Sequence, residues 1–344
     1  MPEANKKRWP LLPILLLALV AVAILSMRFG AVNVGTDEML SSLLKLARHS
    51  GNMNLNERIF LQIRLPRALL CLTIGASLAV GGVLMQALFR NPIVEPGLIG
   101  TSSGAAFGAA LYFVLGAMFK FNTGEWTLPF AACSGAMLST VMVLGLSRSK
   151  QTGRSSVIAL LLIGIAVNAL FISGVGFLSY IARDPQARSI TFWGLGTLSG
   201  ANWHAVIITA CSSIGCILVA HRYAKHLNAL MMGEEQAQLT GVDTRKLKLI
   251  VMTLNVVMIA VATSFVGIIS FVGLIVPHLL RIINGSDNRK LIWTSALSGA
   301  ILLSLADLLA RMLLRPAELP IGIVTSVIGV PVFILLLKRT NYLF

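Results

Sequence analysis

The sequence predicts an all-α, polytopic membrane protein with about ten transmembrane helices in each protomer. Of its 344 residues 56% are hydrophobic and only 12% are charged, whereas a soluble domain averages about 25% charged residues. The mean hydropathy is +0.83. The apolar residues fall in blocks near the roughly 17–25 residues that a membrane-spanning helix needs. We therefore expect one transmembrane domain over residues 1–344 rather than a soluble enzyme.

Ten apolar segments are the candidate spans, and the eighth of them is short and contains Pro277. With the N-terminus in the cytoplasm, the C-terminus is cytoplasmic as well, and most of the 28 Lys and Arg residues fall on the cytoplasmic side, as the positive-inside rule requires. The formal charge of +15 therefore indicates topology and not nucleic-acid binding, which would need one basic face. The spans are 11–27, 68–89, 97–119, 128–147, 157–181, 203–220, 248–268, 270–284, 291–310 and 320–337.

The first span has two interpretations. Lys6, Lys7 and Arg8 precede an apolar run, and Ala21-Val22-Ala23 resembles a cleavage site, which is the pattern of a secretory signal peptide. Because a polytopic domain follows, we expect an uncleaved first span.

Three segments lie outside the predicted spans. Residues 28–67 form an outer segment, in which 36–48 has the spacing of an amphipathic helix. Residues 187–200 predict a short outer helix. Residues 221–246 form the longest polar stretch on the cytoplasmic side, with two short helical patterns that Gly233 separates. This stretch is either a solvated loop or, because it keeps apolar residues at helical spacing, a pair of helices that docks on a partner.

The motifs of catalysis are missing from the sequence. It contains no Gly-Lys pair and hence no phosphate-binding loop. The five histidines form no metal pair, and the four cysteines lie in apolar runs as small buried residues. We expect no catalysis, metal or cofactor in this chain. A gradient-driven secondary transporter would need intramembrane ion sites, which are sparse, so a separate ATPase is expected to drive transport. A passive channel or scaffold remains the third possibility and would not need the docking helices.

Several motifs, in order along nearly the whole chain, resemble the permease subunits of type II ATP-binding-cassette importers. Those proteins import iron–siderophore complexes, haem and cobalamin. The motifs are RLPR (64–67), RNPIVEPGLIGTSSGAAFG (90–108), LNALMMGEEQAQLTGV (227–242), SFVGLIVPHLLRIINGSDNRK (270–290), ADLLAR (306–311) and AELPIGIVTSVIGVPVFILLLK (317–338).

The resemblance implies a cobalamin-permease-like fold in the bacterial inner membrane. It implies a homodimer, two ATPase subunits that bind ATP and Mg²⁺, and a periplasmic substrate-binding protein. Arg64, Arg67 and Arg311 match basic positions that receive acidic residues of the binding protein. Lipid-headgroup anchoring and an internal pair of Arg311 with Asp307 are the alternatives.

The resemblance also assigns coupling and gating residues. The 227–241 helix pair matches the coupling loop that inserts into the ATPase, and we expect contacts through Leu230, Gly233 and Glu234. One cytoplasmic gate matches Asn91 and Ile93. The second aligns with Ser155–Ile158, where Val157 and Ile158 stand in place of the hydroxyl residues that family members can carry. The pathway is expected to be lined by Gly164, Asn168 and Ser173, although small residues also serve to pack membrane helices.

The substrate prediction depends on residues 187–203. Their sequence, ARSITFWGLGTLSGANW, resembles the corresponding segment of haem permeases. Haem is therefore the favoured substrate, with an iron–siderophore or cobalamin as the alternatives.

Overall fold

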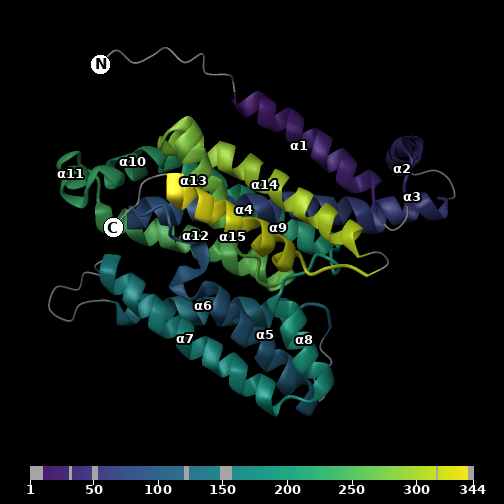
Figure 1. Cartoon of the computed structure of the whole chain (residues 1–344), viewed down its shortest axis with the longest axis horizontal. Helices are drawn as coiled ribbons and strands as arrows, with labels where there is room; N and C mark the ends of the chain where they lie inside the picture. The colour runs from purple at the N-terminus through teal and green to yellow at the C-terminus, as the bar shows by residue number, and fades with distance from the viewer. Residues whose placement is uncertain are drawn as a thin grey trace.

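A computed structural model describes residues 11–30, 33–48, 53–119, 124–147, 157–314 and 317–339. These residues form helices and connecting segments, with no strand among them (Figure 1). In chain order the helices are α1 (Leu11–Arg28), α2 (Thr36–Arg48), α3 (Leu55–Ile59), the π-helix η1 (Phe60–Arg64), α4 (Leu65–Phe89), the 3₁₀-helix η2 (Pro96–Ile99), α5 (Thr101–Met118), α6 (Thr127–Leu146), α7 (Val157–Ile181), α8 (Asp184–Gly194), α9 (Trp203–Arg222), α10 (Ala224–Met232), α11 (Glu234–Leu239), α12 (Thr244–Val266), α13 (Val272–Asn284), α14 (Asn288–Leu313) and α15 (Ile321–Arg339).

The predicted spans coincide with helices. Eight helices in the described part of the chain are long and apolar enough to cross a membrane. Two of the predicted spans correspond to shorter apolar helices, Thr101–Gly116 within α5 and Val272–Asn284, which is α13. The all-α polytopic fold that the sequence predicts is therefore confirmed.

The long helix α4 lies at the centre of the larger group of helices. It packs against α9, α12, α13 and α14, whereas α5 packs against α6, α7 and α8 in a second group, drawn below the first in Figure 1. Glycines allow the closest approaches to α4, because a methyl group on Gly75 would collide with the backbone of Gly299, and one on Gly82 with that of Gly273. Such small-residue contacts are typical of helices packed in membranes.

Two pairs of short helices mark opposite ends of the bundle. The α2–α3 pair lies at one end and the α10–α11 pair at the other (Figure 1). The predicted amphipathic helix is present as α2, and its leucines Leu40, Leu43 and Leu44 are exposed. Below, the two ends are called the α2–α3 end and the α10–α11 end.

Candidate functional site

Three of the predicted site residues, Arg64, Arg67 and Arg311, come together at the α2–α3 end. Arg67 donates from Nε and Nη2 to Asp307 Oδ1, at 3.0 and 2.9 Å. Arg311, one turn beyond Asp307 on α14, places its Nε 2.9 Å from Asp307 Oδ2. The i,i+4 pair that the spacing allows is thus present, and Asp307 is held between two guanidinium groups.

Arg64 and Arg311 also bind the end of α1. The main-chain carbonyl of Phe29 accepts from Arg64 Nη1 at 2.8 Å and from Arg311 Nη1 at 3.1 Å. Arg311 Nη2 donates to the carbonyl and the hydroxyl of Ser26, at 3.1 and 2.9 Å. Carbonyls at the C-terminal end of a helix lack partners within the helix, so two cations satisfy the end of α1 and fix it to the bundle.

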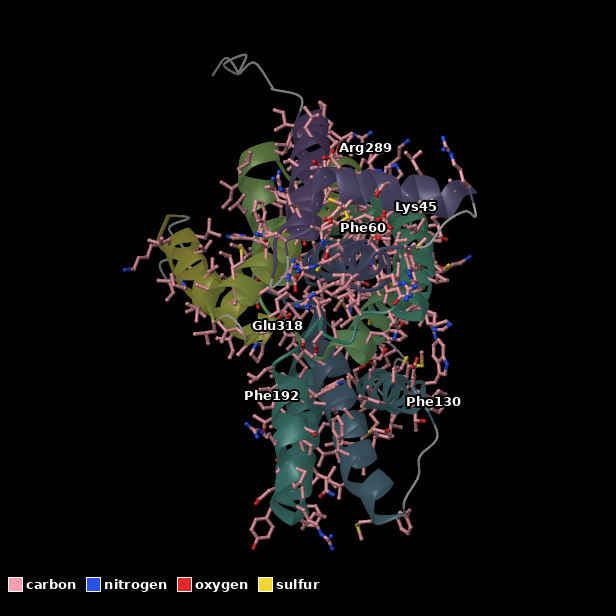
Figure 2. All side chains as sticks on the ribbon, turned by 90° about the vertical axis from the view of Figure 1, so that its right-hand side faces the viewer. Lys45, Phe60, Phe130, Phe192, Arg289 and Glu318 are labelled. Atoms are coloured by element: carbon pink, nitrogen blue, oxygen red, sulfur yellow. The ribbon has the colours of Figure 1, made fainter. Side chains whose placement is uncertain are left out.

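Sequence reasoning missed Glu318 in this cluster. Glu318 lies between α14 and α15 and accepts from Arg67 Nη1 at 2.9 and 3.0 Å. Figure 2 looks onto this end and shows Glu318 near its centre. The side chain of Glu318 is 41% exposed, whereas the side chains of Arg67 and Arg311 are 10% and 4% exposed. The sequence did offer a signal for Glu318, because it is the only acidic residue in the sequence that connects α14 and α15 and it lies in the AELP motif.

At the α10–α11 end, the structure has the expected helix, glycine and second helix. Leu230 is 2% exposed and packs in the protein's own core, as does Leu227. Met232 and Leu239 point outward instead and are 78% and 87% exposed. Met232 and Leu239 are therefore the large apolar side chains that these two helices expose, and Leu230 supports α10 from behind.

Gly233 and Glu234 shape the turn between these two helices. Gly233 has φ 136° and ψ 152°, a conformation that residues with a side chain rarely adopt. Glu234 accepts from Lys248 Nζ at 2.7 Å on both oxygens, and from the Thr244 hydroxyl at 3.2 Å. Burial raises the pKa of Glu234, but the hydrogen bond and the positive charge of Lys248 lower it by more. The pKa of Glu234 therefore lies below its ordinary value. The ion pair fixes α11 to the first turns of α12.

The segment after α4 carries the first pair of predicted gate residues. Arg90 is in the left-handed conformation (φ 51°) and ends α4. The Asn91 side chain accepts from the main-chain N–H of Ile93 at 3.0 Å, and Ile93 is 40% exposed. This short turn presents Ile93 to the surface at the α10–α11 end of α4.

The second half of this segment enters the bundle rather than remaining a loop between span ends. Asn255, near the midpoint of α12, donates to the carbonyl of Pro96 at 3.0 Å. Glu95 accepts from the main-chain N–H of Phe271 at 3.3 Å, at the start of α13. Non-helical backbone at such a depth is tolerated where protein surrounds it and supplies hydrogen bonds. The segment that follows the Asn91–Ile93 turn is therefore anchored to the middle of α12 and to the start of α13.

The other predicted gate residues begin α7. Val157 is partly buried and Ile158 is 70% exposed. Ser155 and Ser156 lie outside the described residues. The structure thus places Ile158 on the surface of the second helix group.

The predicted pathway residues occupy different faces of α7. Gly164 is buried, and a methyl group there would lie 2.8 Å from the carbonyl of Leu98. The lack of a side chain at Gly164 therefore allows η2 to pack closely against α7. Asn168 is partly buried and Ser173 is exposed. A pocket of about 270 Å³ opens beside them without including any of the three, and its lining is apolar: Phe107, Leu138, Met142, Leu170, Phe171 and Gly174. Among the described residues, no group of three or more His, Cys, Asp or Glu could hold a metal ion.

Known proteins resemble this chain over most of its length. The model of the FecCD transport family matches residues 16–339. The hemin transport system permease protein HmuU of Yersinia pestis is 37% identical over 327 residues, covering 95% of this chain and 96% of that protein. The vitamin B12 import system permease protein BtuC of Yersinia enterocolitica is 38% identical over 286 residues, covering 83% of each.

A solved structure assigned as a metal-chelate type ABC transporter, in an inward-facing conformation, has the same fold. It superposes with a TM-score of 0.82 at 31% identity, covering 96% of this chain and 100% of that one. The family match and the relatives together span nearly all of the chain. The chain therefore belongs to the FecCD transport family and is an ABC importer permease.

Proposed function

We propose that this permease works as a homodimer, forms one transmembrane domain over residues 1–344, and imports an iron chelate, with haem as the favoured substrate. ATP and Mg²⁺ bind to two separate ATPase subunits, and the chain itself is not an enzyme. A periplasmic binding protein delivers the substrate across the bacterial inner membrane. The first span is retained, which is supported by the bonds from Arg64 and Arg311 to the end of α1.

The observation that carries the proposal is the exposed apolar surface of the α10–α11 pair. Met232 and Leu239 are large apolar side chains that project from short helices at the end of the bundle. Apolar residues that cluster on an exposed surface indicate an interaction site. We assign this surface to the ATPase, which places the α10–α11 end and both termini in the cytoplasm. Gly233 and Glu234 set its shape, and Leu230 supports it.

The opposite end then faces the binding protein. The cluster holds three arginines against the two carboxylates of Asp307 and Glu318, which leaves one excess positive charge. Because Glu318 is the exposed member, an acidic residue of the binding protein would compete with Glu318 for Arg67. Arg64 and Arg311 contribute charge from beneath the surface. Long-range attraction of this kind steers and orients a partner.

The gate lies at the α10–α11 end of α4, and the pathway runs between the two ends. Asn91 and Ile93 form the cytoplasmic gate, since their turn is exposed and is anchored through Pro96 and Glu95 inside the bundle. Val157 and Ile158 complete the gate from α7. Gly164, Asn168 and Ser173 border the pathway on that helix. A cysteine at Asn91 that forms no cross-link between protomers in any nucleotide state would contradict the gate.

Haem is favoured because the segment 187–203 resembles haem permeases and because a hemin permease of Yersinia pestis is similar over almost the full chain. A vitamin B12 permease has comparable identity over a shorter length, so cobalamin is the second candidate, and an iron–siderophore is the third. A secondary transporter driven by an ion gradient is the candidate from another class.

The test uses the permease co-purified with its ATPase and reconstituted with its binding protein in proteoliposomes. Uptake of haemin, cyanocobalamin and a ferric hydroxamate siderophore is compared with and without ATP and vanadate. We expect ATP-dependent, vanadate-sensitive uptake of haemin. Uptake that needs a proton or sodium gradient but no ATPase would contradict the proposed importer, and preference for cyanocobalamin would contradict only its substrate.

A second experiment addresses the two docking surfaces separately. Leu239→Asp changes an exposed side chain and should weaken assembly with the ATPase, while binding-protein affinity stays unchanged. Arg67→Glu should weaken binding-protein association instead. Loss of both partners in either variant would indicate misfolding rather than docking.

A further inference from the structure

Arg281, in the last turn of α13, contacts three other helices with one guanidinium group. Its Nη1 lies 3.5 Å from Met231 Sδ on α10. Its Nη2 donates to Asn288 Oδ1 on α14 and to the carbonyl of Val83 on α4, both at 3.4 Å. Its Nε donates to Gln86 Oε1, also on α4, at 3.4 Å. No residue assigned above to docking, coupling or gating makes such a set of contacts.

On one side, Arg281 touches the junction that holds α10. The side-chain oxygen of Asn228 on α10 accepts from the main-chain N–H and the side-chain amide of Asn288, at 2.9 and 2.8 Å. The same amide donates to Met231 Sδ at 3.2 Å. Asn288 is fully buried. Movement of α10 would therefore carry Met231 with it and act on Asn288 through Asn228, and both Met231 and Asn288 are partners of Arg281.

On the other side, Arg281 touches the last turns of α4. The side chain of Gln86 is buried, accepts from Arg281, and donates to the carbonyl of Leu274 at 3.1 Å. The main-chain carbonyl of Gln86 accepts from the N–H of Asn91 at 3.2 Å. Gln86 thus holds Arg281 with its side chain and the first gate residue with its main chain.

The chemistry of these contacts suits a connection that rearranges. Every acceptor of Arg281 is neutral, and among the described residues no carboxylate forms an ion pair with it. The distances of 3.4–3.5 Å lie beyond the usual range of strong hydrogen bonds. A planar guanidinium can hold several acceptors at once, and bonds to neutral groups are weaker than those to carboxylates. Arg281 can therefore exchange partners as α10 moves, at a small energetic cost.

We propose that Arg281 is a positioning residue that transmits movement of the α10–α11 segment to the end of α4 and so to the gate turn at Asn91 and Ile93. The inference rests on the proposed ATP-driven function. It predicts that loss of Arg281 separates ATP hydrolysis from opening of the gate, and leaves assembly with the ATPase intact.

The test compares Arg281→Met and Arg281→Lys in the complete complex, reconstituted in proteoliposomes. Met keeps the length of the side chain without its donors, and Lys keeps the charge without the planar fork. Haemin uptake, ATP hydrolysis and the thiol reactivity of an Ile93→Cys variant are measured, with the exposed Cys211 replaced by Ser. We expect Arg281→Met to lower haemin uptake per ATP about tenfold and to abolish the nucleotide dependence of thiol reactivity. Arg281→Lys should give an intermediate result.

The matched control is Arg222→Met, which removes an exposed cation at the end of α9 and should behave as wild type. Wild-type coupling and a wild-type thiol response in Arg281→Met would overturn the inference. If neither Arg281 variant assembles, Arg281 is a folding residue and the inference is also overturned. Wild-type complex that takes up no haemin would contradict the proposed substrate alone, because the thiol response of Ile93→Cys does not depend on the substrate.

Discussion

Two arginines near opposite ends of α4 show how differently the two ends of this permease are built. Arg67 makes four hydrogen bonds of 2.9–3.0 Å to the carboxylates of Asp307 and Glu318. Arg281 makes four contacts of 3.4–3.5 Å, all to neutral acceptors. Hydrogen bonds between charged groups are shorter and stronger than those to neutral groups. The arginine cluster at the α2–α3 end is therefore held rigid, whereas the contacts of Arg281 at the α10–α11 end can rearrange.

This difference matches the roles proposed above for the two ends. A surface that receives a folded binding protein gains from a fixed arrangement of charge, because ordering it on binding would cost affinity. A segment that carries motion from an ATPase needs an alternative arrangement close in energy. The contacts of Arg67 and of Arg281 differ in strength as these two proposed roles would require.

The largest expected effect comes from Asp307→Asn, which breaks the rigid end. The substitution keeps the shape of the side chain but leaves Arg67 and Arg311 without the carboxylate between them. Removing one partner of a buried ion pair costs about 3–5 kcal/mol. We expect a large fall in the unfolding midpoint of the purified chain. Ser304→Ala, at another buried position of α14 whose hydroxyl has no partner in the described structure, is the control. An unfolding midpoint of Asp307→Asn equal to that of Ser304→Ala would contradict the claim that the arginine cluster at the α2–α3 end is rigid.

The next largest effect is expected at the other end, from Gly233→Val. A β-branched residue at φ 136° and ψ 152° is strained by about 1–3 kcal/mol, so α10 and α11 should change their relative direction. The expected result is ATP hydrolysis without uptake of haemin. Gly215→Ala is the matched control, since a methyl group there meets open space within α9. Normal uptake per ATP in Gly233→Val would argue against the coupling assignment.

The two ends also differ in how much of them the sequence predicts. The spans follow from length and apolar composition, which are local properties. The break at Gly233 is local too, because glycine commonly ends a helix. The inward position of Leu230 and the outward position of Met232 were not predictable, since both are apolar and α10 is only nine residues long. Which of them is buried depends on where α4 and α14 lie.

The polar contacts that distinguish the ends join residues far apart in the chain. Arg67 and Asp307 are 240 residues apart, and Gln86 and Arg281 are 195 apart. The i,i+4 spacing allowed only the Arg311–Asp307 pair to be anticipated. The motif resemblance assigned Arg64, Arg67 and Arg311 to one docking surface. It did not show that these arginines share the acceptors Phe29 and Asp307, or that Glu318 belongs to the same cluster. The same limit applies to Glu95, whose contact with Phe271 spans 176 residues.

A smaller effect is expected from Glu318→Gln, which removes the negative charge on the exposed side of Arg67 only. An exposed ion pair contributes about 1 kcal/mol or less, so the unfolding midpoint should change little. If an acidic residue of the binding protein competes with Glu318, its affinity should rise by roughly fivefold, equivalent to about 1 kcal/mol. Surface plasmon resonance with the binding protein measures this change. Unchanged or weaker binding would remove Glu318 from the docking surface.

The smallest expected effect is the pH dependence at Asp287, which precedes α14 and fixes α10. Asp287 accepts from Asn228 at 2.7 Å. Hydrogen bonds from Arg289, and after them that from Asn228, hold the pKa of Asp287 below its ordinary value. A carboxyl group with a lowered pKa in the folded state contributes stability above its unfolded pKa and loses it as the pH falls through the folded pKa.

The anchoring of α10 by Asp287 should therefore stay constant from about pH 8 to about pH 5 and weaken only in stronger acid. The measurement is the difference in unfolding midpoint between the wild type and Asp287→Asn across this range. We expect a small difference that is flat above about pH 5 and shrinks as Asp287 itself becomes protonated. A difference that already shrinks between about pH 8 and pH 6 would show that Asp287 titrates near neutrality, and that protonation can release the α10–α11 end.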